Sequence, residues 1–272
     1  MNWLAPLRAA ADQPPRSPRV PLWAGTTQVG SVEPEFIRKI ELQRIPYLHR
    51  VLLKVQQNGT TGWQLQGDPT NSLAHLAHIL RDAGLAAAWR DEQLAVPAAD
   101  GQDGQVVATV ERAVVRALGI TTRAVHLVGA APDGRVWVQQ RAFTKPNDPG
   151  LWDTLVGGMV SAADNLDTAL ERETWEEAGL RLPSLHGLRL GGQLTTRRPS
   201  TDSGGAGYVV EHIHWYSCTL PEGVQPQNQD GEVERFDLLA PALLAQQLAQ
   251  GVFTDDAALI LAQYLGLPDS YT

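Results

Sequence analysis

The sequence of 272 residues contains one cysteine and no long apolar run, and both absences narrow what the chain can be. Cys218 has no partner for an intrachain disulfide, so the composition fits a reducing cytosol and we expect a cytoplasmic protein. No stretch approaches the roughly 18 apolar residues of a membrane span, and residues 1–20 lack the apolar core of a secretory signal. The formal net charge of −8 argues against a general nucleic-acid surface.

The length leaves room for two modest domains. Residues 1–19 are rich in Pro, Arg and Ala, and we expect a loose segment with at most a short helix. We place a first domain over residues 20–119 and a second over 120–272, with the boundary near Ile120. For the first domain, turn and helix signals predict a hairpin within 20–32, helices over 34–41, 71–84 and 111–118, and two strands within 94–112.

The second domain is predicted to mix strands with helices, which indicates an α+β fold. A glycine-rich stretch over residues 197–207 is expected to be a flexible loop able to close over a substrate. The predicted strands cover 124–131, 135–141, 188–196, 208–220 and 233–238, and two further helices cover 241–250 and 255–265.

An acidic helix is predicted inside residues 158–180, which read GMVSAADNLDTALERETWEEAGL. The spacing of Glu173, Glu176 and Glu177 places all three carboxylates within about 100° of one helix face. Such crowding of like charges destabilises a helix. A cluster of this kind is most often an acidic helix face exposed to solvent. Carboxylate oxygens with no Cys or His beside them favour Mg²⁺ or Mn²⁺ when they form a metal site instead.

Local signals set the limits of this helix. Asp164 and Asn165 stand where the helix should begin, and either can cap it. Gly179 is placed to end the helix, as glycine commonly does at this position. Gly157-Gly158, before the helix, permits either a positive φ or a close backbone approach. A buried stripe at helical spacing is predicted for Leu166, Ala169 and Leu170.

The segment resembles the Nudix box, in which Gly158, Arg172, Glu173, Glu176, Glu177 and Gly179 stand at the expected offsets, followed by aliphatic Leu180. Asp164 replaces a usual Glu, which weakens a role in salt bridging or water positioning. Thr174 replaces a usual aliphatic residue at a packing position. The resemblance implies a Nudix α/β/α sandwich, with metal held by the three box glutamates and the Gly158 carbonyl.

Further segments resemble a narrower Nudix subgroup, the one related to thiamine pyrophosphokinase. They are RVPLWAG, WRDEQLAV and VERAVVRALGI before the box, TKPNDPGLWDTLVGG at 144–158, and residues 207–236. This resemblance spans Val20 to Leu239. It implies a smaller N-terminal α+β accessory domain and a diphosphatase that acts on thiamine diphosphate or its oxidised analogues.

Candidate residues lie both inside and outside the box. Among the acidic residues of QDGEVERF, which include Asp230 and Glu234, we choose Glu232 because resembling families place a carboxylate just before this valine. The general base is either Glu232 or a box glutamate. The predicted catalytic residues are Arg172, Glu176 and Glu232, the predicted metal site comprises Gly158, Glu173, Glu176 and Glu177, and the predicted phosphate-binding cations are Arg141, Lys145, Arg197 and Arg198.

Several alternatives remain open from the sequence. The enzyme can instead hydrolyse nucleoside diphosphates, and a non-catalytic diphosphate sensor would carry the same box. An isomerase of isopentenyl diphosphate would need a cysteine in its pocket, and Cys218 lies in a strand well after the box. The first domain either supports the second or forms one wall of its pocket, and Trp63, Trp89 and Arg90 are its candidate wall residues. Trp63, Trp89 and Trp152 are also candidates for stacking on a heteroaromatic ring, although core packing is the more common role of such residues. The expected partner is a small diphosphate, with no nucleic acid or membrane, and the chain is expected to be a monomer or homodimer.

Overall fold

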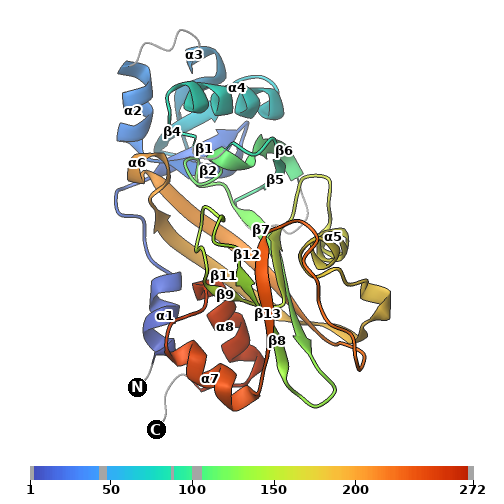
Figure 1. Cartoon of the computed structure of the whole chain (residues 1–272). Helices are drawn as coiled ribbons and strands as arrows, with labels where there is room; N and C mark the ends of the chain where they lie inside the picture. Colours follow the sequence, from blue (N-terminus) through green and yellow to red (C-terminus); the bar gives the residue numbers. More distant parts are fainter. Residues whose placement is uncertain (1–2, 43–47, 87–88, 100–105, 269–272) are drawn as a thin grey trace.

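The buried core of the protein is divided near Ile120. The computed structural model describes residues 3–42, 48–86, 89–99 and 106–268. One hydrophobic cluster runs from Leu22 to Ile120 and adds Ala206, while other clusters draw on residues 124–261. Figure 1 shows the corresponding two bodies, with the elements from β1 to β6 above the larger C-terminal sheet and α1 beside α8 below.

The N-terminal body contains a four-stranded sheet of order β2-β1-β4-β3, built from two hairpins joined by parallel pairing of β1 with β4. The first hairpin agrees with the predicted one, whereas the second was missed. Its turn is Asn58-Gly59, with φ of 48° and 79°, and this dipeptide favours a two-residue hairpin turn. The strands are β1 (Val20–Ala24), β2 (Thr27–Val32), β3 (Leu52–Gln57) and β4 (Thr60–Leu65).

Helices and a separate two-stranded ribbon complete this body. The predicted helix over 111–118 is wrong in extent, because the structure has only a 3-10 turn there, capped by the Glu111 side chain, which accepts a hydrogen bond from the Ala113 backbone N–H. The elements are α2 (Pro34–Leu42), α3 (Leu48–Val51), α4 (Pro69–Asp82), the ribbon strands β5 (Gln93–Pro97) and β6 (Val106–Glu111), and η1 (Arg112–Val114).

The C-terminal body is a sheet of order β11-β12-β7-β8-β13, with β10 paired to β7 and β9 paired to β8. Its strands are β7 (Thr122–Ala130), β8 (Val136–Arg141), β9 (Trp152–Asp153), β10 (Val156–Met159), β11 (His186–Ser200), β12 (Gly207–Thr219) and β13 (Val233–Leu239). The helices are α5 (Leu166–Ala178), α7 (Pro241–Ala249) and α8 (Asp255–Tyr264), and η2 (Leu182–Ser184) is a 3-10 turn.

Helices cover both faces of this sheet (Figure 1). On β7, Ala124 and Val128 join the cluster beneath α7 and α8, while Val125 and Leu127 join the cluster beneath α5. Successive strand residues point to opposite faces, so β7 contributes to both cores. The α+β class and the α/β/α arrangement are therefore confirmed. Within the described residues, no helix is long and apolar enough to span a bilayer.

Two segments differ from the sequence expectation. Residues 197–207 are not a free loop. Strand β11 continues to Ser200, a turn that contains α6 (Asp202–Gly205) follows, and β12 then begins at Gly207 and pairs with β11. The N-terminal segment, expected to be loose with at most a short helix, contains the short helix α1 (Leu4–Ala11) and is not loose. This helix packs on α8 by burying Leu4 and Ala11 against Leu259 and Ala262.

Candidate functional site

Helix α5 carries the box and has well-formed ends. Of the two candidate caps, Asn165 begins the helix by accepting hydrogen bonds from the Asp167 and Thr168 backbone N–H groups. The Thr168 hydroxyl accepts a bond from the Asn165 N–H in return, which completes a capping box. Gly179 ends the helix with φ of 64°. Local capping therefore fixes where α5 begins and ends.

Arg172 ties the box together. Its guanidinium donates to Asp164 at 3.0 Å, to Glu173 at 2.8 Å and to Glu176 at 2.9 Å. A further bond reaches the Met159 carbonyl at 3.2 Å. Asp164, despite its shorter side chain, therefore keeps the salt bridge that the usual Glu would make. Arg172 thus orients two box carboxylates and joins α5 to β10.

Glu177 lies deeper than the other box glutamates, with 1% of its surface exposed. Its Oε2 accepts hydrogen bonds from the Gln139 side chain at 2.9 Å and from the Gly157 N–H at 2.8 Å. Lys145 Nζ is 3.6 Å from its other carboxylate oxygen. Burial raises the pKa of Glu177 to about 8, although Lys145 acts in the opposite direction. The positive charge near Glu177 therefore does not offset the cost of burying its ionised carboxylate.

Both box glycines are needed for close approach. Gly158 faces the Glu173 carboxylate, where an added Cβ would lie 2.5 Å from Oε2 and closer still to Oε1. A Cβ at Gly157 would lie 2.6 Å from the buried His126 ring. Neither glycine has a positive φ, so close approach, rather than backbone conformation, is what requires glycine here. Thr174 is fully buried at its packing position.

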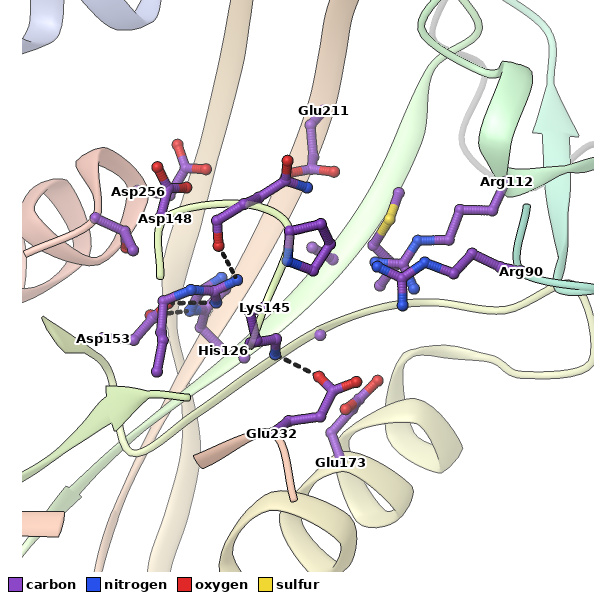
Figure 2. Close-up of a pocket in the computed structure, with 18 of the residues that line it drawn as sticks. Arg90, Arg112, His126, Lys145, Asp148, Asp153, Glu173, Glu211, Glu232 and Asp256 are labelled. Atoms are coloured by element: carbon purple, nitrogen blue, oxygen red, sulfur yellow. Dashed lines mark hydrogen bonds and ion pairs between the residues drawn. The ribbon is translucent and has the colours of Figure 1, made fainter. Parts of the chain in front are cut away.

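A cavity of about 390 Å³ opens beside the box helix (Figure 2). Both bodies of the protein line it, so the N-terminal body does form one wall. The lining is strongly polar and includes most of the predicted site residues. Those residues are Arg141, Lys145, Gly158, Arg172, Glu173, Glu176, Arg198 and Glu232.

Two predicted cations meet the acidic residues in this cavity. Lys145 forms an ion pair with Glu232 (Figure 2) and also faces Glu177. Burial opposes ionisation of Glu232, but the Lys145 hydrogen bond and charge hold its pKa below the ordinary value. Arg141 donates to Asp153 at 3.2 Å and to the Asn147 carbonyl at 3.1 Å. The loop between β8 and β9 thus presents fixed positive charge to the cavity.

The structure separates two adjacent arginines of β11. Arg198 lines the cavity and pairs with Asp256 at 3.0 Å. Arg197 points away and pairs with Asp12 at 3.0 Å on the exposed surface. The expectation that both bind phosphate therefore does not agree with this arrangement, because alternate strand residues face opposite sides. Among the acidic candidates, Asp230 and Glu232 line the cavity and Glu234 does not.

The aromatic candidates lie outside the cavity, none of Trp63, Trp89 and Trp152 being among the described residues that line it. Trp89 stacks with His78 and lies under the Arg81 guanidinium. Cys218 is buried in the core beneath α5, where burial raises the pKa of its thiol to about 12. It does not line the cavity, which disfavours an isomerase that requires a pocket cysteine.

Sequence reasoning missed a large part of the cavity wall. The N-terminal body contributes four charged residues, of which only Arg90 was a candidate. Three further residues, His126, Asp153 and Thr154, form a buried group behind the box glycines, with His126 Nδ1 2.8 Å from the Thr154 hydroxyl. The missed lining residues include Glu92, Arg112, Arg116, His126, Asp148, Asp153, Glu211 and Asp256. No local motif marks them.

The donor set fits a hard divalent cation. Among the described residues, no three His, Cys, Asp or Glu side chains are gathered as a ready metal site. Arg172 instead occupies oxygens of Glu173 and Glu176, so a divalent ion would compete with it for them. Burial also raises the pKa of Glu173 to about 7. Buried carboxylate oxygens that lack sufficient neutralising charge suit a hard cation such as Mg²⁺ or Mn²⁺.

Comparison with known proteins places the chain in a family. The NUDIX domain model matches residues 120–259. Nudix hydrolase 20, chloroplastic, of Arabidopsis thaliana is 29% identical over 203 residues, covering 73% of this chain and 52% of the relative. Nudix hydrolase 24, chloroplastic, of the same plant is 26% identical over 200 residues, covering 72% and 53%. The crystal structure of DR0079 from Deinococcus radiodurans has a TM-score of 0.49 and 22% identity, covering 63% of this chain and 98% of that one.

The chain belongs to the NUDIX family, as the box resemblance implied. Nudix hydrolases generally use divalent metal ions and bind small diphosphate compounds. The chain spans about half the length of the curated relatives it matches.

Proposed function

We propose that the protein is a Mg²⁺-dependent diphosphatase that converts thiamine diphosphate, or its oxidised analogues, to the monophosphate and phosphate. One observation carries the proposal: the cavity has two chemically different ends. Figure 2 shows Lys145, Glu173 and Glu232 at one end, and Glu211 and Asp256 at the other. The first end suits a metal-bound diphosphate, and the second suits a cationic organic group.

At the first end, Glu173, Glu176 and Glu177 would hold Mg²⁺, with the Gly158 carbonyl as a further ligand. When bound, Mg²⁺ neutralises diphosphate oxygens and lowers the pKa of water. Glu232 is ionised at neutral pH because of Lys145 and can accept a proton from the attacking water, as can a box glutamate such as Glu176.

Two cations at this end orient the phosphates and stabilise the charge that develops on the leaving phosphate. Lys145 lies between Glu177 and Glu232, and these two carboxylates hold its ammonium in place. Arg141 is held by Asp153, so its planar guanidinium presents a fixed donor surface. Arg172 acts through the box carboxylates that it orients rather than on the substrate.

At the second end, the charges favour a cation. Arg198 already compensates Asp256, whereas Glu211 forms no ion pair with any described residue and accepts a bond from the Thr122 hydroxyl at 2.9 Å. Desolvation, followed by repulsion from Asp256, raises the pKa of Glu211. The thiazolium ring of thiamine diphosphate, and of any oxidised analogue that keeps this ring cationic, would supply the missing positive charge, which a neutral nucleoside cannot do.

The test is a panel of diphosphates assayed for phosphate release with Mg²⁺ and with excess chelator. We expect thiamine-type diphosphates to exceed nucleoside diphosphates in kcat/KM by at least ~10-fold, or about 1.4 kcal/mol of transition-state preference. Bare pyrophosphate should be a poor substrate because remote binding energy contributes to turnover. The Glu211→Gln variant should narrow the preference for thiamine-type compounds.

The possible outcomes separate the rival functions. Equal or reversed preference would discard the thiamine assignment in favour of a nucleoside diphosphate hydrolase. Binding of diphosphates without phosphate release, with either Mg²⁺ or Mn²⁺ present, would identify a non-catalytic sensor. Full activity in chelator would refute the metal-dependent mechanism itself.

A further inference from the structure

The N-terminal body sends two arginines into the catalytic cavity. Arg90 precedes β5, and Arg112 begins the 3-10 turn η1 that follows β6. Figure 2 shows both side chains extending from that wall into the cavity. The box and these arginines therefore approach the same space from different bodies of the protein.

Backbone contacts hold this wall against the box. The Ala162 N–H donates to the Gln93 carbonyl at 2.7 Å, and Leu94 forms an antiparallel bridge with Ser161. Both contacts join β5 to the loop between the box glycines and α5. These two backbone contacts therefore place the wall formed by β5 next to the box.

The arginines are also held within their own wall. The Arg90 N–H donates to a Glu111 carboxylate oxygen at 3.0 Å, and the Arg112 N–H donates to the Glu92 carbonyl at 2.9 Å. The Arg112 guanidinium pairs with the Glu92 side chain at 2.7 Å. The Arg90 guanidinium has no hydrogen bond or ion pair with any described residue. Two cations and one carboxylate leave a net positive charge facing the cavity.

The electrostatics of the opposite wall agree with this placement. Although burial opposes ionisation of Glu232, its pKa is lowered first by Lys145 and then by the charges of Arg112 and Arg90. Arg90, Arg112 and Glu232 line the same cavity, so the charges of the two arginines act across it on a predicted catalytic residue. The positive charges of Arg90 and Arg112 would likewise attract an anion bound between the two walls.

We propose that Arg90 and Arg112 bind the terminal phosphate of the substrate, opposite the box carboxylates. This inference rests on the proposed diphosphatase function and adds that the N-terminal body selects for the diphosphate group itself. Planar guanidinium groups bind phosphate oxygens in pairs and with directional hydrogen bonds. Glu92 competes with the phosphate for Arg112 and so limits how tightly the phosphate is held.

The test uses single variants of the full chain with thiamine diphosphate as substrate. Arg90→Gln and Arg112→Gln should each raise KM by about tenfold and change kcat by less than about threefold, because they remove binding shared by ground and transition states. Glu92→Gln should lower KM by about threefold, since it releases Arg112. Arg38→Gln, an exposed arginine on α2 outside the cavity, is the matched control and should leave both constants unchanged.

A purely structural role cannot produce opposite changes in KM from the two partners of one ion pair, and thermal melting will identify any variant that fails to fold. Binding of inorganic pyrophosphate, measured by calorimetry with Mg²⁺, keeps the inference separate from the proposed function. Affinity should fall in the arginine variants and rise in Glu92→Gln, even if no organic diphosphate is hydrolysed. Unchanged KM and pyrophosphate affinity in both arginine variants would overturn the inference, as would no pyrophosphate binding by the wild type.

Discussion

Replacing Gly158 with alanine should disable the site while leaving the fold intact. An added Cβ would lie 2.5 Å from Glu173 Oε2 and closer to the rest of the carboxylate, whereas ordinary contacts begin near 3.4 Å. The Glu173 carboxylate must therefore move by roughly 1 Å, and misplacement of this size costs about 10²-fold in catalysis. We expect kcat for phosphate release to fall by about that factor.

The stability cost should be small, because the obstructing atoms are the end of a flexible side chain. Moving Glu173 weakens its ion pair with Arg172, in which the Arg172 and Glu173 side chains are 33% and 12% exposed. Arg172 keeps its hydrogen bonds to Asp164, Glu176 and the Met159 carbonyl, so the loss should be smaller than for a fully buried pair. Gly157→Ala provides the contrast, since its Cβ would meet the buried His126 ring, which cannot move aside. That variant should lower the melting temperature clearly more.

A double-mutant cycle identifies the cause of the lost activity. The Gly158→Ala/Glu173→Ala double variant should be no slower than Glu173→Ala alone, because removing the carboxylate also removes the clash. Phosphate release gives the rates, and circular dichroism gives the melting temperatures. Activity of Gly158→Ala within threefold of wild type would refute the reasoning, and so would strictly additive losses in the cycle.

Further predictions concern the carboxylates. Glu176→Gln and Glu177→Gln should each cut turnover by at least ~10²-fold. The control variant Glu171→Gln, on the exposed face of the same helix, should leave turnover unchanged. Wild-type turnover in either box variant would disprove the metal assignment. Burial raises the folded-state pKa of Glu173 to about 7 and of Glu177 to about 8, from an ordinary 4.5. Protonation of these two groups therefore stabilises the metal-free fold at low pH, and this stability should be lost as pH rises from 4.5 to 8. Mg²⁺ should therefore raise the melting temperature more at pH 8 than at pH 5 and restore activity lost to chelator, and a larger rise at pH 5 would contradict this.

The sequence alone determined the box helix, because the interactions that define it are local. Glu173, Glu176 and Glu177 share a face through helical spacing, and Asn165 and Gly179 set the ends of α5 through contacts a few residues long. The same holds for strands marked by alternation and turns. The hairpin at Asn58-Gly59 also had a local signal, which sequence reasoning overlooked.

Tertiary structure decided which charged residues share the cavity. Arg197 and Arg198 are adjacent in sequence, and only the pairing register of β11 with β12 determines which one faces the site. Arg90 and Arg112 reach the box because β5 pairs with the loop before α5, a contact between residues far apart in the chain. Such pairings depend on how whole sheets and helices pack, so no short stretch of sequence encodes them.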